Sequence, residues 1–190
     1  MRDKTDQIIR AAISVFVKKG FLQATTQEIA KEADVAEVTL YRKFSTKQNL
    51  FETVIKKVLE NQFQNKIIKI AVEDTDAFFL KILDERLETL SKNQKMIKML
   101  LAESLMGNLS DDLNFPTLIF NGLKKGIKIH FDHMNIKADA KLVAQQIGGI
   151  LLSNVLFING TPYFELDDKE KKVILNHHIQ SLKANLQIIL

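Results

Sequence analysis

The sequence predicts an all-α protein of about nine helices, and three observations predict it. Seven Gly and two Pro are the few helix breakers in 190 residues, which are rich in helix-favouring residue types. Apolar residues recur at the three-and-four spacing of a helix, and no long segment alternates with the period of a strand. Hydrophobic residues make up 46% and charged residues 26% of the chain, as in folded globular proteins.

The first fifty residues predict three short helices. Apolar side chains at helical spacing place the first helix at about residues 4–19, with its end at Gly20. Thr25 and Glu28 fit a capping box, in which each side chain satisfies a backbone amide, so a second helix begins there. A third helix of about two turns is expected over residues 37–44.

Longer helices are expected in the remainder of the chain. Ser45 and Thr46 offer a cap for a long fourth helix, which is expected to continue without a break to Ile70. We therefore expect a small domain at residues 1–46, joined through this helix to a larger helical domain at 47–190. The later helices are expected at about residues 75–91, 94–107, 113–133, 138–159 and 168–189.

The net charge of +4 belongs to the N-terminal third of the chain. Residues 1–57 hold eleven Lys and Arg against seven Asp and Glu, whereas residues 58–190 hold sixteen of each sign. A positive surface attracts a phosphate backbone through Coulomb forces and counterion release. The surplus is small, but it falls on the segment that holds the three short helices.

The spacing of the second and third helices suits a helix-turn-helix, the unit that lays its second helix in the major groove of DNA. Ala30 permits close approach of the two helices, and Val35 fills the space under the turn. Leu40 and Phe44 hold the later helix on the core. A solvated helical hairpin in another kind of α-protein fits the same spacing, so the pattern alone leaves both interpretations open. The polar side chains left outside this packing are Thr39, Tyr41, Arg42 and Lys43.

Residues 25–35 and 38–47 carry a specific pattern, in which the cap, the turn, the triplet Thr39-Leu40-Tyr41 and Phe44 before a Lys-bearing helix start fall in register. This pattern resembles the N-terminal signature of TetR/AcrR-type bacterial transcriptional regulators over about residues 5–57. The resemblance implies a DNA-binding repressor without cofactor or catalytic activity, which acts as a homodimer on a palindromic, inverted-repeat operator. Residues beyond this segment resemble the family only in length and helical character.

Carried over by position, the resemblance implies DNA contacts at eight residues. Thr26, Thr39 and Tyr41 are implied to contact the DNA backbone, and Gln27 a base. Lys47 opposes the dipole of the fourth helix, which makes sense if it shares a phosphate with that helix N-terminus. The remaining three occupy positions that read base edges or adjacent phosphates, with Arg42 the weakest match. The eight residues are Thr26, Gln27, Glu37, Thr39, Tyr41, Arg42, Lys43 and Lys47.

Two residues depart from the family pattern. Asp34 stands in the turn where the family commonly has Gly, and Asp tolerates the left-handed conformation better than most residues. Ala36 stands where a capping Ser is frequent, which is expected to weaken the third helix by about 1 kcal/mol.

The last two helices indicate a dimer interface. Apolar residues of the last helix step by three and four up to Ile189, and the preceding helix is apolar nearly all round. Such a pair meets its symmetry mate in a four-helix bundle in the resembling family. Burial of both helices within one protomer is the alternative. The expected interface residues are Gly148, Gly149, Leu175, Ile179, Leu182 and Leu186.

The middle helices are rich in Phe and Met, which line adaptable apolar pockets and also fill ordinary cores. Glu103 stands out because its own helix is apolar almost everywhere else. Its carboxylate must be paired, be neutralised, cap a neighbouring helix or match a cationic ligand. We hypothesise a small-molecule effector that is lipophilic, with Glu103 available for a cationic group. The candidate pocket residues are Phe79, Met96, Met99, Leu100, Glu103 and Phe120.

Composition excludes several other chemistries. The chain has no Cys, which removes disulfides, thiolate catalysis and Cys-ligated metals. His130 and His133 have helical spacing but no third ligand, so we expect a solvated helix end and no metal. The N-terminus lacks a signal-peptide core, and the apolar run 147–158 is too short for a membrane span, so a cytoplasmic location is expected.

Two other classes of function compete with a ligand-sensing regulator. An α-helical enzyme would need a nucleophile with a base, paired carboxylates or a metal set, and the sequence shows none, so we expect no enzyme. A helix-turn-helix protein that acts as an adaptor without an effector is the second, and a domain closed to ligands would favour it.

Overall fold

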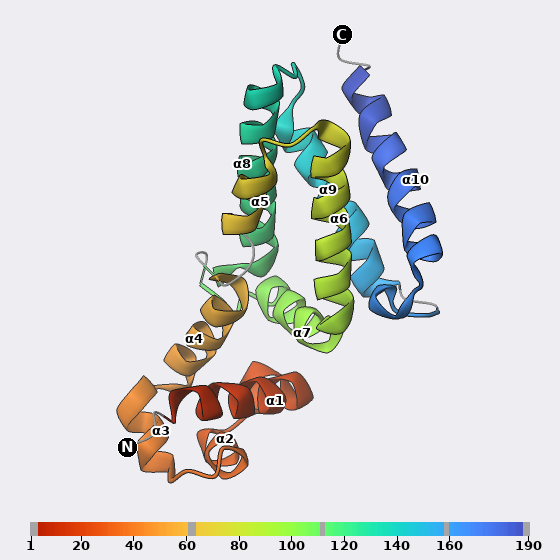
Figure 1. The fold of residues 1–190 in the computed structure, drawn as a ribbon. Coiled ribbons are helices and arrows are strands. Elements are labelled where there is room, and N and C mark those ends of the chain that lie inside the picture. The colour runs from red at the N-terminus through yellow and green to blue at the C-terminus, as the bar shows by residue number, and fades with distance from the viewer. Residues whose placement is uncertain (1–3, 61–63, 111–112, 158–159, 188–190) are drawn as a thin grey trace. The chain divides into compact units, whose positions relative to one another are not determined.

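The computed structural model describes residues 4–60, 64–110, 113–157 and 160–187. All regular structure in these ranges is helical, which confirms the all-α fold class. None of the described helices has both the length and the apolar character needed to cross a bilayer. The described helices are α1 (Thr5–Gln23), α2 (Thr26–Glu32), α3 (Glu37–Phe44), α4 (Lys47–Glu60), α5 (Gln64–Ile70), α6 (Thr75–Lys92), α7 (Gln94–Leu105), α8 (Phe115–Met134), α9 (Ala140–Leu156), the 3-10 helix η2 (Tyr163–Glu165) and α10 (Asp168–Gln187) (Figure 1).

The helix caps and the turn around α2 and α3 form as predicted. The Thr25 hydroxyl accepts from the Glu28 N–H at 3.2 Å, and the Glu28 carboxylate accepts from the Thr25 N–H at 3.3 Å, which completes the capping box. Asp34 adopts a left-handed φ of 47° and turns the chain without glycine. Ala36 caps α3 without a side-chain hydrogen bond. The helix pair therefore forms where the spacing placed it.

Some predicted helix limits differ from the described ones. Of the helix expected from Thr46 to Ile70, the structure describes α4 and α5, and the residues between them lie outside the described ranges. Residues 61–63, with Phe63, lie outside the described residues, as do 158–159 and Ile189 at the ends of two later predicted helices.

The chain divides into two packing units, and the expected domain boundary after residue 46 stays a prediction. Unit 1 comprises residues 1–62 and 99–115, and unit 2 comprises 63–98 and 116–190. The reason is that α4 completes the N-terminal core, with Leu50, Phe51, Val54 and Ile55 fully buried. The whole of α4 and the later part of α7 therefore belong with the helix-turn-helix.

Aromatic side chains form the centre of unit 1. Phe51 of α4 lies edge-on to Phe16 of α1, with ring centroids 4.7 Å apart, and stacks on Phe21 at the same separation. Leu40 and Phe44 of α3 are buried, as their spacing predicted. Edge-to-face and offset-stacked rings stabilise such a core beyond their buried area.

The central helix of unit 2 is α6, which packs against α5, α9, α10 and η2. It contributes Phe78, Phe79, Leu83 and Leu87 to the core, all fully or almost fully buried. Figure 1 shows α6 running beside α9 and α10.

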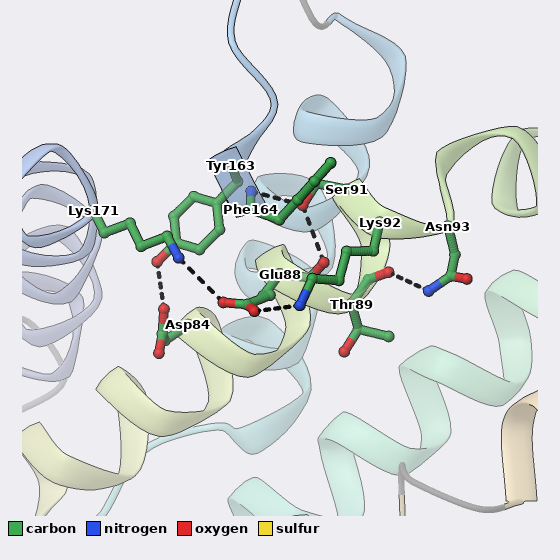
Figure 2. Close-up of polar contacts among 9 residues, drawn as sticks. All are labelled: Asp84, Glu88, Thr89, Ser91, Lys92, Asn93, Tyr163, Phe164 and Lys171. Atoms are coloured by element: carbon green, nitrogen blue, oxygen red, sulfur yellow. Dashed lines mark hydrogen bonds and ion pairs between the residues drawn. The ribbon is translucent and has the colours of Figure 1, made fainter. Parts of the chain in front are cut away.

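Polar contacts attach η2 and the start of α10 to one side of α6 (Figure 2). The Tyr163 hydroxyl donates to Asp84 at 2.7 Å, and the Phe164 N–H donates to the Ser91 hydroxyl at 3.1 Å. Lys171 pairs with Glu88 at 3.2 Å. Burial and the bond to Asp84 raise the pKa of Tyr163, so its hydroxyl stays a donor at neutral pH.

His130 is buried inside unit 2, so the expectation of a solvated helix end is wrong for this residue, whereas His133 is exposed as expected. Its ring stacks on Phe78 with a centroid separation of 4.0 Å. Nδ1 lies 2.9 Å from the Ala71 carbonyl and Nε2 lies 3.2 Å from the Thr75 hydroxyl. A neutral ring that donates through Nδ1 and accepts at Nε2 satisfies both partners. Burial lowers the pKa of His130, and the bond to the Ala71 carbonyl opposes this effect.

Stability is expected to fall as the pH drops below 6.5, the usual pKa of histidine. Because the folded-state pKa of His130 is lower, the unfolded chain takes up a proton first. The free energy of unfolding then decreases between pH 6.5 and the folded-state pKa, by at most about 1.4 kcal/mol per pH unit. Above this window the ring is neutral in both the folded and the unfolded state, so it no longer contributes to the pH dependence of stability. Urea denaturation at several pH values measures the slope.

The variant His130→Gln removes the ionisable ring and is expected to lose this part of the slope. Burial also lowers the pKa of His178, so the double variant with His178→Gln supplies the baseline. An unchanged slope in His130→Gln would contradict the assignment.

Candidate nucleic-acid interface

The exposed face of the helix pair is set by what α3 buries. Leu40 and Phe44 hold α3 on the core, so the opposite side of this helix faces outward. Tyr41 and Arg42 are exposed on α3, and Gln27 is exposed at the start of α2. Thr39 is half-buried.

A hydrogen-bonded cluster joins α2 to α3. The Thr26 hydroxyl donates to the Glu37 carboxylate at 2.6 Å, and the Tyr41 hydroxyl lies 3.1 Å from the Thr26 oxygen. Because Thr26 has one hydroxyl proton, Tyr41 is the donor to Thr26. With 9% of its surface exposed, Thr26 acts here as a spacer between the helices rather than as a surface donor. The cluster therefore sets the spacing and angle of the helix pair.

Lys47 is engaged inside unit 1, in contrast to the phosphate contact implied by the resemblance. Its ammonium lies 2.9 Å from the carbonyl of Phe21, 3.3 Å from that of Leu22 and 3.0 Å from that of Ala24. It also lies 4.6 Å from the centre of the Phe21 ring. An ammonium has three N–H donors, and these carbonyls account for all of them. The Lys47 ammonium, at the start of α4, thus donates hydrogen bonds to the carbonyl groups at the end of α1.

Two cations lie on the outer surface in the last turn of α3, Arg42 and Lys43. The Lys43 ammonium donates to the Thr5 hydroxyl at 2.8 Å, an exposed contact. A phosphate oxygen is a stronger acceptor than this neutral hydroxyl, so DNA can replace it.

Val38 is a surface residue that sequence reasoning missed. Its side chain is 73% exposed on α3, on the side opposite to Leu40 and Phe44. The helical spacing of Val38 relative to Leu40 and Phe44 indicates this exposure, although the side chain is apolar. An apolar group at such a position suits the methyl group of thymine.

The candidate pocket residues are divided between the two units. Phe79, Met96 and Phe120 belong to unit 2, whereas Met99, Leu100 and Glu103 belong to unit 1. Unit 2 has a hollow of about 390 Å³ beside Ser91 and Tyr163 and another of about 430 Å³ beside Asp84 and Lys171. Neither of these two hollows is lined by any of the six residues.

The Glu103 carboxylate already has partners. One oxygen accepts from the Phe21 N–H at 2.8 Å and the other from the Asn108 amide at 2.7 Å. Glu103 therefore caps a neighbouring helix, which is one of the alternatives that the sequence left open.

The predicted dimer seam on α10 lies within the protomer. Leu175, Ile179 and Leu182 are buried in the core of unit 2, and Leu186 packs against it. The expectation that they face a second copy is thus corrected, because the apolar side of α10 is needed to cover α6 and α9. Added Cβ atoms at Gly148 and Gly149 would meet no atom within 4 Å, so this part of α9 lies open.

A different, mainly apolar stripe is exposed on α9. Its members step by three, four, three and four along the helix, which places them on one face. Three are leucines, one is glycine and one is glutamine. They are Leu142, Gln145, Gly149, Leu152 and Leu156, all exposed.

Comparison with known sequences identifies the N-terminal segment. Residues 8–54 match the family described as bacterial regulatory proteins, tetR family. The uncharacterized HTH-type transcriptional regulator YvkB of Bacillus subtilis (strain 168) is 34% identical over 117 residues, which cover 62% of this chain and 60% of that protein. The chain therefore spans less than two thirds of the length of this relative.

Solved structures with the same fold cover nearly the whole chain. A Clostridium perfringens protein described as a candidate fatty acid metabolism regulator is 25% identical, with a TM-score of 0.67 over 97% of this chain and 98% of that one. FadR of Bacillus subtilis, solved in complex with stearoyl-CoA, is 19% identical, with a TM-score of 0.61 over 97% and 96%. Residues 8–54 thus carry the signature of the tetR family of bacterial regulatory proteins, and the fold of the chain is shared with these solved structures.

Proposed function

We propose that the protein is a sequence-specific transcriptional repressor that binds an inverted-repeat operator as a homodimer and responds to a small lipophilic ligand. The observation that carries this proposal is the outer face of α2 and α3, where Gln27, Val38, Arg42 and Lys43 are exposed on a helix pair held by the Thr26 cluster. Such a face fits the major groove, which admits one helix.

The exposed side chains divide into positioning and reading groups. Lys43 supplies positive charge to phosphates, which gives affinity without sequence preference. Gln27 can donate to and accept from an adenine edge, and Arg42 can donate twice to a guanine edge. Val38 supplies an apolar contact for a thymine methyl group. Tyr41 can turn its hydroxyl from Thr26 to a phosphate, since both are acceptors.

The exposed stripe of α9 supports the homodimer. Three leucines on one face of a helix favour burial against an equal face, and Gly149 permits a close approach. Across a two-fold axis, the amide of Gln145 can both donate to and accept from a second copy. A two-fold dimer would present two copies of α3 to two half-sites, centred about one or two helical turns apart.

The apolar interior of unit 2 supports a lipophilic ligand. Phe78 and Phe79 of α6 belong to a large apolar core, and FadR, which has the same fold, was solved with stearoyl-CoA. A cationic group on the ligand has no partner in Glu103, because its carboxylate is bound to Phe21 and Asn108. A ligand that favours the non-binding state by about 1–3 kcal/mol would lower operator affinity about 5- to 150-fold.

The variant Lys43→Ala is expected to weaken binding to all sequences alike. Selection of bound duplexes from a random pool supplies the operator, and fluorescence anisotropy at several salt concentrations measures the affinity. Loss of one phosphate contact should reduce the slope of log K against log salt by about 0.9.

Lys47→Ala is the matched control for this experiment. It removes the same charge, but its ammonium is bound to carbonyls of unit 1, so it should lower stability by about 1–3 kcal/mol. Measured well below its melting temperature, it should leave the salt slope almost unchanged. If both variants changed the slope equally, the assignment of Lys47 to the end of α1 would be refuted.

The variant Leu152→Lys is expected to convert the dimer into monomers, because it places a charge within the exposed stripe of α9. Sedimentation should show half the mass, and affinity for the full operator should fall toward that for one half-site. Leu80→Lys is the control, since Leu80 is an exposed leucine of α6 outside the stripe. A dimeric Leu152→Lys variant would rule out this face.

A further inference from the structure

Glu103 connects the later part of α7 to the end of α1. Its side chain is 6% exposed, and its carboxylate accepts from the backbone N–H of Phe21, which lies 82 positions earlier in the chain. Both residues belong to unit 1. A carboxylate removed from water needs good hydrogen-bond partners, so this contact is a specific feature of the packing.

The backbone of α1 is shaped for this contact. Gly20 interrupts the helix with φ 75° and ψ 170°, a conformation that is strained for any residue with a side chain. A Cβ at this position would lie 3.3 Å from the Glu103 oxygen. Glycine therefore both permits the break in α1 and leaves room for the carboxylate.

Phe21 also contacts α4, through its carbonyl group and its ring. Its carbonyl accepts from the Lys47 ammonium at 2.9 Å, so an anion holds its N–H and a cation holds its carbonyl. Its ring stacks on Phe51 of α4, with centroids 4.7 Å apart. The ends of α1 and α7 and the start of α4 therefore meet at one residue.

We propose that Glu103 is a positioning residue for DNA binding, which acts through Phe21 to fix the end of α1 and, with it, the start of α2. This role rests on the proposed function. The chain passes from unit 2 to unit 1 within α7, at residues 98 and 99.

The test compares Glu103→Leu with Glu103→Gln. Leucine fills the space but offers no acceptor to the Phe21 N–H, whereas glutamine keeps one oxygen for it, and Asn108 can turn its amide to suit. Glu103→Leu is expected to weaken operator binding about 2- to 30-fold and to remove the hydrogen-exchange protection of the Phe21 amide. Glu103→Gln should retain the protection and most of the affinity.

Ser104→Ala is the control for loss of stability alone. Ser104 is the next residue of α7 and is 7% exposed. Its hydroxyl accepts from the Phe115 N–H at 3.1 Å, so the variant also leaves a buried N–H without its acceptor. This bond joins two residues of the segment 99–115, whereas the Glu103 bond reaches α1. It should lower the melting temperature and leave both the operator affinity and the Phe21 protection unchanged.

The outcomes separate this role from the proposed function. If the wild-type protein selects no duplex, both the function and the role fail. If it binds an operator and Glu103→Leu binds equally well, only the role fails. Equal weakening by Ser104→Ala and Glu103→Leu, at the same folded fraction, would also overturn the role, because the effect would then follow from stability.

Discussion

The end of α1 carries backbone groups that the rest of unit 1 is arranged to satisfy. The last carbonyls of a helix have no partner within it, and here Lys47 of α4 binds those of Phe21, Leu22 and Ala24. Since α2 begins at Thr26, two residues after Ala24, the position of this end also determines where α2 starts. Thr26 then holds Glu37 and Tyr41 of α3. The reading helix is thus located by a series of polar contacts that begins at the end of α1.

Local features of this domain could be predicted from the sequence because their causes lie within a few residues. The capping box needs only Thr25 and Glu28, three positions apart, and the turn needs a residue that tolerates the left-handed conformation, which Asp34 does. The burial of Leu40 and Phe44 follows from helical spacing alone. The position of the helix pair and most of its exposed side chains therefore followed from short-range chemistry.

Other features depend on partners that are distant in the chain, and the sequence does not reveal them. Lys47 binds carbonyls 23 to 26 positions earlier, and Glu103 binds an amide 82 positions earlier. Spacing shows that α10 has an apolar face, but not whether α6 or a second copy covers it. His130 is enclosed by partners more than 50 positions earlier in the chain, among them Phe78, Ala71 and Thr75.

Contact between base pairs and the outer face of α2 and α3 can be measured by mapping the backbone amides that respond to DNA. The wild-type protein, labelled with nitrogen-15, would be titrated with its selected operator and with an unrelated duplex of equal length. We expect the operator to shift the amide resonances of Gln27, Val38 and Tyr41 most, and the unrelated duplex to shift them less. Shifts centred on α9 or α10, or equal shifts with both duplexes, would contradict it.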